Sequence, residues 1–342
     1  MGHGEDSPFL KYNNMEFDME TWIGIDISKD TFDAAYEQDG KKLHEKFPNN
    51  TAGFKSLVKW APEGSKFVME STGTYHMRCA LFLADSNRHV SVENPLAVKR
   101  FIQSDLRRCK SDKSDAFSIA KYGREKIPKA WTVPTKEARE ARRLQGFIEM
   151  LQVQLTEQGN LLHAYQQEDL KDEALKECKS MIKVLKNAIA KAEMALTEVV
   201  CKRWKEDVEL ISSIPGIGVI SACKLVAKVE DFTRFEDSRQ YMSWLGMTPR
   251  NMQSGTSIHV NGGITKMGDG RLRTQFYMCA VASIKFNDRC KAMWERMRAK
   301  GKPAKVVFIA IACKLLKTAY ALVITKQKYE VNYKTKILQK AS

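Results

Sequence analysis

Residues 21–47, TWIGIDISKDTFDAAYEQDGKKLHEKF, have the pattern of consecutive β-strands. Isoleucines occupy every second position from 23 to 27, which is the period of a strand with one apolar face. Residues 31–47 predict two further strands joined at Asp39-Gly40, a dipeptide favoured in two-residue hairpin turns. The chain therefore opens with a predicted three-stranded antiparallel meander.

Helical and strand patterns alternate after this meander. The sequence predicts helices over 51–61, 75–86 and 115–125, and strands over 65–71 and 89–94. Strands that alternate with helices after a meander indicate a mixed sheet covered by helices. This element order is that of an α/β RNase H-like fold.

Four acidic residues take related positions in this layout. Asp26 lies on the first strand and faces away from its isoleucines, Glu70 ends the fourth strand, and Asp112 and Asp115 open the last helix one turn apart. Clustered carboxylates repel one another unless a cation neutralises them, and oxygen ligands select Mg²⁺, with Mn²⁺ as the alternative. Such a site suits two-metal phosphoryl transfer. Taken singly, each acid is also explained as a helix cap or as a solvated strand end.

The charge of the chain indicates a polyanionic partner. Lys and Arg number 56 against 41 Asp and Glu, a net charge of +15, which favours nucleic acid over a membrane. Cations flank the predicted acidic site and are expected to hold a phosphate backbone there: Lys99, Arg100, Arg107, Arg108, Lys110 and Lys113.

The cysteines and the apolar segments indicate the cellular compartment of the protein. The eight cysteines show no zinc or disulfide spacing and are expected to be reduced. The apolar run that starts at Val306 is interrupted by Lys314 and Lys317, so no membrane span is expected. Residues 1–19 resemble no export signal and are expected to form a flexible tail, and residues 331–342 a basic tail. We therefore expect a cytoplasmic protein.

The middle of the chain, 135–205, has a helical pattern with an apolar seam. The seam recurs at alternating three and four residues, as in a coiled coil. Its members are Ile182, Leu185, Ile189, Ala192, Leu196 and Val199. The pattern fits an antiparallel hairpin packed within one chain and also fits pairing between chains.

Two glycine-rich segments follow. Pro215-Gly216-Ile217-Gly218 resembles a helix-hairpin-helix turn, whose backbone N–H groups can approach a phosphate. Residues 248–273 predict a polar loop with hydroxyls at Ser254, Thr256 and Ser257, which by themselves are ordinary turn formers. Cations near this loop are expected to contact nucleic acid: Arg250, Lys266, Arg271 and Arg273. His259 has no partner at ligand spacing, and His76 is expected to be structural or to lie behind the acids.

Four motifs of the first half are distinctive: GIDISKDTFD, MESTGTYH, VENPLAVKRF and RRCKSDKSDAFSIAKYG. Together they resemble the DEDD transposases of bacterial insertion sequences, a family that includes the Piv/MooV invertases. Later motifs agree: LISSIPGIGVISACKLVAKV, FEDSRQYMSWLGMTPRNMQSGTS and GDGRLRTQFYMCAVASI. The resemblance implies a RuvC-like metal domain at 20–134, a helical coiled-coil segment at 135–205 and a mainly α transposase domain at 206–330. It also implies a catalytic serine at Ser254, with Ser257 as the alternative assignment.

The same resemblance implies the partners and the reaction. These are donor and target DNA, an element-encoded bridge RNA that guides the enzyme, a homo-oligomer (dimer or tetramer) and a location at the bacterial nucleoid. Strand exchange would then pass through a phosphoserine intermediate with Mg²⁺ assistance. Two alternatives stay open: a RuvC-like nuclease that cleaves junctions with water, and a non-catalytic scaffold that only binds nucleic acid.

Overall fold

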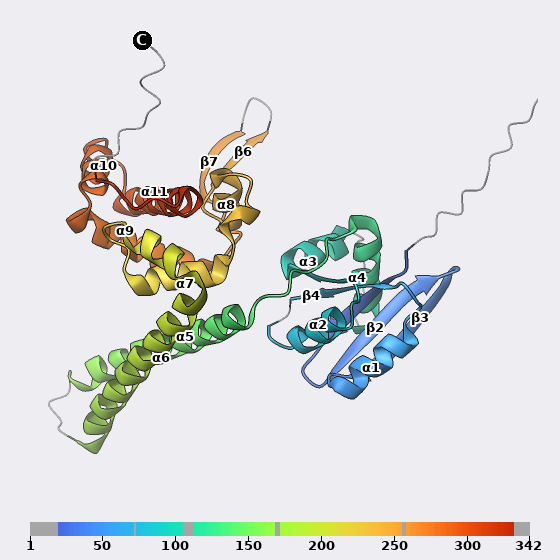
Figure 1. The fold of residues 1–342 in the computed structure, drawn as a ribbon. Helices are drawn as coiled ribbons and strands as arrows, with labels where there is room; N and C mark the ends of the chain where they lie inside the picture. The colour runs from blue at the N-terminus through green and yellow to red at the C-terminus, as the bar shows by residue number, and fades with distance from the viewer. Residues whose placement is uncertain (1–19, 72, 105–111, 168–171, 255–257, 332–342) are drawn as a thin grey trace, which may run out of the picture. The chain divides into compact units, whose positions relative to one another are not determined.

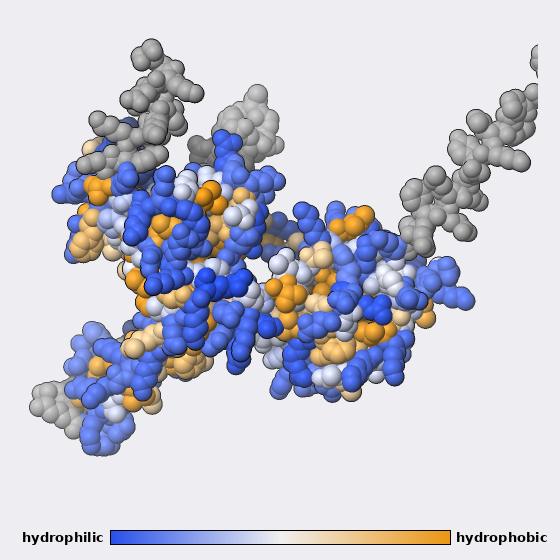
Figure 2. Space-filling model, viewed as in Figure 1, coloured by the Kyte–Doolittle hydropathy of each residue, from blue (hydrophilic) through white to orange (hydrophobic). Residues whose placement is uncertain are grey.

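The computed structural model describes residues 20–71, 73–104, 112–167, 172–254 and 258–331, with the backbone alone at 112 and 251–262. The chain divides into two compact units, residues 1–133 and 134–342 (Figure 1). Each unit is described by itself. Hydrophilic residues cover most of the surface in view, as expected for a chain with 28% charged residues (Figure 2).

A five-stranded mixed sheet forms the centre of the first unit. Its strands are β1 (Trp22–Ile27), β2 (Thr31–Gln38), β3 (Lys41–Pro48), β4 (Lys66–Glu70) and β5 (Val90–Glu93), in the order β3-β2-β1-β4-β5. The first three strands are antiparallel, and β1, β4 and β5 are parallel. Asp39 and Gly40 both have positive φ, at 50° and 72°, which the tight β2–β3 turn requires. The predicted meander and the predicted mixed sheet are thus confirmed, and the topology is consistent with an RNase H-like domain.

Helices cover both faces of this sheet (Figure 1). On the isoleucine face, α1 (Thr51–Trp60) and α2 (His76–Asp85) complete a core that includes Phe54, Leu57 and Leu83. The opposite face packs against α3 (Pro95–Ser104) and α4 (Asp112–Lys126) through Ile119 and Tyr122. Because side chains alternate along a strand, this second face is the one that carries Asp26.

Two glycines bring α4 unusually close to β1. A Cβ on Gly24 would collide with the backbone of Ala116 and Ala120, and a Cβ on Gly123 would lie 2.6 Å from Cε3 of Trp22. Hence the carboxyl-terminal part of α4 covers the start of β1, and the helix runs antiparallel to that strand.

The sequence reasoning missed α3. The cations of residues 95–104 predict a basic flank of the acids, yet Val98, Phe101 and Ile102 pack on the sheet at helical spacing. Asn94 Oδ1 accepts the backbone N–H of Leu96 at 2.8 Å at the start of the helix. The lysines and arginines of this segment masked its apolar periodicity.

The second unit is mainly helical. Its elements are α5 (Lys136–Tyr165), α6 (Glu173–Ser212), α7 (Val219–Val229), a 3-10 turn (Phe232–Arg234), α8 (Ser238–Trp244), β6 (Pro249–Ser254), β7 (Ile258–Ile264), α9 (Gly270–Phe286), α10 (Asp288–Ala299) and α11 (Ala304–Thr325). One hydrophobic core joins α6, α7, α8, α9 and α11. The seven described cysteines, three of them buried in this core, carry free thiols.

The helices α5 and α6 form a long antiparallel hairpin (Figure 1). Leu185, Ala192, Leu196 and Val199 of the predicted seam are buried, and Ile148 of α5 lies in the same core. The Sγ of Cys178 lies 3.4 Å from the backbone oxygen of Gln158, which fixes the pairing near the hairpin tip. The seam is therefore used within one chain.

Two further segments of this unit differ from expectation. The predicted loop over 248–273 contains an antiparallel hairpin of β6 and β7, because Met252 and Val260 pair across strands that the polar composition concealed. The helix α11 is long and apolar enough to cross a membrane by length and composition. Val307, Ile311, Leu315 and Ala319 of this helix are buried in the protein core, as in a core helix.

Candidate metal and nucleic-acid site

Four carboxylates cross the sheet of the first unit at one level. Asp26 on β1 is paired with Asp33 on β2, and Glu70 on β4 is paired with Glu93 on β5. The pairing of β1 with β4 reaches Ile25 and Met69, so Asp26 and Glu70 follow immediately on adjacent strands. Paired residues project to the same face. We call Asp33, Asp26, Glu70 and Glu93 the carboxylate row.

The helix α4 approaches the strand that carries Asp26. The backbone at 116–120 covers Gly24, and Asp26 is two strand residues, or about 6.6 Å, further along. The same distance along the helix is four to five residues at about 1.5 Å each. With these ideal rises, and with the helix antiparallel to β1, we expect the first turn of α4, which holds Asp112 and Asp115, to lie near the level of Asp26.

The outer members of the row are held by other side chains. The Tyr122 hydroxyl of α4 donates to Oε2 of Glu93 at 3.0 Å. His44 Nε2 lies 2.7 Å from Oδ1 of Asp33, and Lys46 Nζ lies 3.6 Å from Oδ2. Sequence reasoning missed Asp33 and Glu93, because only the strand register shows that they are level with Asp26 and Glu70.

The row suits a divalent cation in the chemistry of its donors. All its donors are carboxylate oxygens, the ligands of hard cations, and Asp26 and Glu70 are half-buried neighbours. No three His, Cys, Asp or Glu side chains within the described part of the chain are gathered closely enough to hold a metal ion. Of the four predicted ligands, Asp112 is described by its backbone alone.

Three of the predicted cations lie on the helices that cover this face of the sheet. Lys99 and Arg100 of α3 and Lys113 of α4 are exposed, as a phosphate contact requires. Arg107, Arg108 and Lys110 lie outside the described residues.

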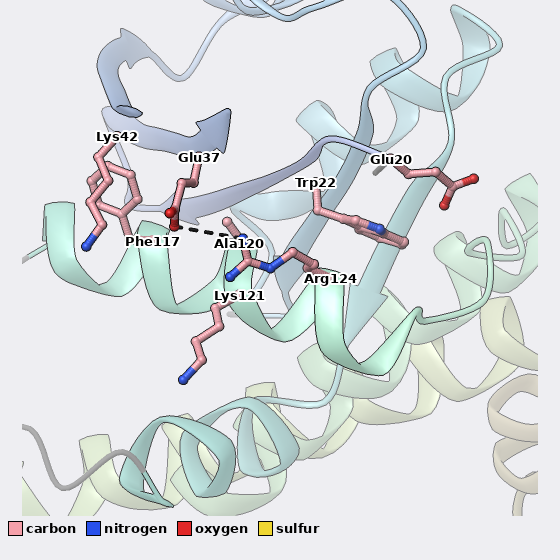
Figure 3. Close-up of a pocket in the computed structure, with 8 residues that line it drawn as sticks. All are labelled: Glu20, Trp22, Glu37, Lys42, Phe117, Ala120, Lys121 and Arg124. Carbon is pink, nitrogen blue, oxygen red and sulfur yellow. Dashed lines mark ion pairs between the residues drawn. The ribbon is translucent and has the colours of Figure 1, made fainter. Parts of the chain in front are cut away.

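A pocket of about 80 Å³ lies beside α4, over β2 and β3 (Figure 3). Arg124 reaches from the helix towards Glu37, 3.8 Å away, and Lys42 Nζ lies 5.8 Å from the ring centroid of Phe117. Lys42, His44 and Lys46 follow one another at alternate positions of β3, so a line of basic groups leads from this pocket towards Asp33.

In the second unit, Ser254 is the last residue of β6 and is paired with Ile258 across the turn of the hairpin. It therefore sits at a hairpin tip, and Ser257 and Thr256 lie outside the described residues. His259 on β7 is described by its backbone. In the first unit, His76 is buried at the start of α2.

The cations around this hairpin differ in their surroundings. Arg250 and Lys266 are exposed. Arg271 is ion-paired with Glu149 of α5, and Arg273 donates to the backbone oxygen of Leu245 at 3.1 Å. Arg273 thus holds the end of α8 in place, a structural role that its sequence position did not reveal.

The glycines of the Pro215–Gly218 turn have separate roles. Gly216 has φ of 102°, and a Cβ there would lie 2.5 Å from the Ser283 Cβ, so this glycine packs against α9. Gly218 begins α7, is exposed and has open space where a Cβ would be. Only the Gly218 side of the turn is open to a phosphate.

Comparisons with known proteins indicate the family of the chain. A family model described as "Transposase IS116/IS110/IS902 family" matches residues 208–295, and a DEDD model of the IS110 group, described as "Transposase", matches residues 23–186. The chain is 28% identical over 322 residues to the "Pilin gene-inverting protein" of Moraxella bovis, covering 89% of this chain and 96% of that protein.

Matches over shorter stretches are also to transposases. The "Probable family 20 transposase" of Pseudomonas aeruginosa is 31% identical over 153 residues, 44% of each chain. The "Transposase for insertion sequence element IS1111A" of Coxiella burnetii is 31% identical over 127 residues, 36% of this chain and 35% of that protein. The DEDD match suggests dependence on a divalent metal. The chain belongs to the IS110 family of insertion-sequence transposases, enzymes that cleave and recombine DNA.

Proposed function

We propose that this transposase exchanges DNA strands through a phosphoserine intermediate formed at Ser254, with Mg²⁺ bound by Asp26, Glu70, Asp112 and Asp115. The observation that carries the proposal is the carboxylate row on the sheet face that α4 covers. Neighbouring carboxylates are costly without a cation, so their alignment on one face supports a metal site. Bound there, Mg²⁺, or Mn²⁺ in its place, would stabilise negative charge on the reacting phosphate.

The serine step conserves the energy of the broken bond. The Ser254 oxygen forms a bond to phosphorus, the bond from phosphorus to the leaving strand's sugar oxygen breaks, and the serine proton ends on that oxygen. A hydroxyl of the other strand then attacks the phosphoserine, re-forms a phosphodiester and returns a proton to Ser254. No nucleotide cofactor is consumed. The exposed Arg250 and Lys266 beside the hairpin would hold the phosphate backbone.

A guide RNA and an oligomer complete the proposal. The charge of +15 supports binding of both DNA and an element-encoded RNA, whose base pairing would choose the target. Phe147 and Met150 on α5 and Met181 and Val184 on α6 are exposed, which supports contact between hairpins of two copies. The enzyme would act at the nucleoid, on donor and target DNA.

The metal site is tested by removing single carboxylates. Asp26→Asn and Glu70→Gln should each lower recombination in cells by at least about a hundredfold, while DNA binding, which depends on cations, changes little. Asp30→Asn, an exposed acid on the loop after β1, is the matched control. Wild-type recombination by the Asp26 variant, or in excess EDTA in vitro, would refute the metal site.

The nucleophile is tested by trapping the intermediate. Wild-type protein with labelled DNA, guide RNA and Mg²⁺ should give a covalent adduct on a denaturing gel, and Ser254→Ala should bind the same DNA without forming it. An adduct that is lost only in Ser257→Ala would move the nucleophile to that residue. Metal-dependent cleavage without any adduct would identify a water-using nuclease, and no cleavage at all would leave a nucleic-acid-binding scaffold.

A further inference from the structure

Asp33 is the carboxylate that the strand register places beside Asp26. The two residues are directly paired on β1 and β2. Opposed side chains of antiparallel strands share one face, with their Cβ atoms about 5 Å apart. Asp33 is only 6% exposed. A second, nearly buried carboxylate next to a proposed metal ligand raises electrostatic repulsion unless other groups compensate it.

The compensation comes from β3, on the side of β2 away from Asp26. His44 Nε2 donates to Oδ1 of Asp33 at 2.7 Å, since a carboxylate can only accept. Lys46, the direct partner of Asp33 in the register, has its Nζ 3.6 Å from Oδ2. Both oxygens of Asp33 thus have a partner on β3, which fixes this carboxylate and directs it away from direct ligation.

We propose that Asp33 is a positioning residue that strengthens divalent-cation binding at Asp26 and Glu70 without touching the cation. The inference rests on the proposed metal site. Asp33 would act through its negative charge beside Asp26, because a carboxylate near the ligands attracts the cation. A unit charge about 7 Å from a divalent cation, largely screened by water, changes affinity by roughly three- to tenfold.

Two substitutions are expected to change cation affinity in opposite directions, and this distinguishes an electrostatic role of Asp33 from simple support of the fold. Asp33→Asn removes negative charge and should weaken cation binding by about fivefold. Lys46→Gln removes the positive charge that partly cancels Asp33, so it should tighten binding by about twofold. Damage to the fold would weaken binding in both variants. Lys42→Gln is the matched control, because Lys42 lies on the same strand and face but is paired with Glu37.

The experiment measures Mn²⁺ binding to the full-length protein without nucleic acid, by the electron paramagnetic resonance of free Mn²⁺. We expect weaker binding for Asp33→Asn, tighter binding for Lys46→Gln and wild-type binding for Lys42→Gln. Equal affinity of Asp33→Asn and wild type, or weaker binding by Lys46→Gln, would overturn the inference.

Failure of the metal site itself gives a different result. Wild-type protein would then bind no Mn²⁺, or Asp26→Asn would bind it undiminished, and both proposals would fall together. Circular dichroism melts check the folding of each variant. If Asp33→Asn does not fold, the comparison of Lys46→Gln with Lys42→Gln decides: tighter binding supports the role of Asp33, and unchanged binding overturns it.

Discussion

At the scale of single residues, Tyr122 ties α4 to the outer end of the carboxylate row. Its hydroxyl donates to Glu93 at 3.0 Å, and the side chain is buried. Burial, and then the hydrogen bond and charge of Glu93, raise the pKa of Tyr122 to about 12. The neutral phenol is therefore the form that the folded protein holds.

This pKa predicts how stability changes in alkali. An unfolded tyrosine titrates near pH 10, so from about pH 10 to pH 12 the unfolded chain releases a proton that the folded chain keeps. Stability then falls as pH rises through this window. Tyr122→Phe should be less stable than wild type at pH 9 but should lose less stability between pH 9 and 11, by urea unfolding.

A second buried group provides an internal reference for that measurement. Burial raises the pKa of the Cys79 thiol to about 12, so this thiol causes its own alkaline loss of stability. The loss is the same in both proteins and cancels in their difference. Identical slopes for wild type and Tyr122→Phe would contradict the role of Tyr122.

Gly24 sets the distance between α4 and the row. Gly24→Ala would drive a methyl group into the backbone of Ala116 and Ala120. We expect a loss of about 3 kcal/mol in the free energy of unfolding, as for severe overpacking, together with weaker metal binding because the first turn of α4 is displaced. Gly146→Ala on α5, where a Cβ would meet nothing, should instead be neutral or stabilising by up to about 1 kcal/mol. Unfolding in urea gives both values, and a neutral Gly24→Ala would show that α4 adjusts freely.

At the scale of elements, the α5–α6 hairpin depends on a seam that one chain buries. Leu196 is fully buried in the core, whereas Met194, two residues earlier, is 73% exposed. Leu196→Ala should cost about 3 kcal/mol of unfolding free energy through lost burial and a residual cavity. Met194→Ala should change it by less than about 0.5 kcal/mol. Equal effects, measured by urea unfolding, would argue against this packing.

Sequence patterns at this scale predicted some elements and missed others for physical reasons. The strands of the meander were predictable because Ile23, Ile25 and Ile27 mark one buried face and Asp39-Gly40 marks the turn. The helix α3 was missed because its apolar side chains are interspersed with lysine and arginine. The β6–β7 hairpin was missed because glycine and polar residues dominate it, and cross-strand pairing is not visible in composition.

At the scale of the whole molecule, the surplus of cations sets how binding responds to salt. Affinity for DNA or RNA should fall steeply as salt rises, because each phosphate contact releases counterions. Replacing Lys99 and Arg100 together by Gln should reduce the slope of log K against log salt by about 2. The matched control replaces Lys202 and Lys205, which are ion-paired on α6, and should leave the slope unchanged. Filter binding at several salt concentrations gives these slopes. Equal slopes for both double variants would show that Lys99 and Arg100 of α3 do not contact the nucleic acid.

Local sequence patterns were enough to predict the family, the mixed sheet, the apolar seam of the helical hairpin and the candidate acids Asp26 and Glu70. These features follow from local periodicity and short motifs, which depend only on residues that are close together in the sequence. The folded chain was needed to see that Asp33 and Glu93 are level with those acids, and that α4 comes close to β1 at Gly24. Strand register and helix approach depend on contacts between residues distant in sequence, so no local pattern specifies them.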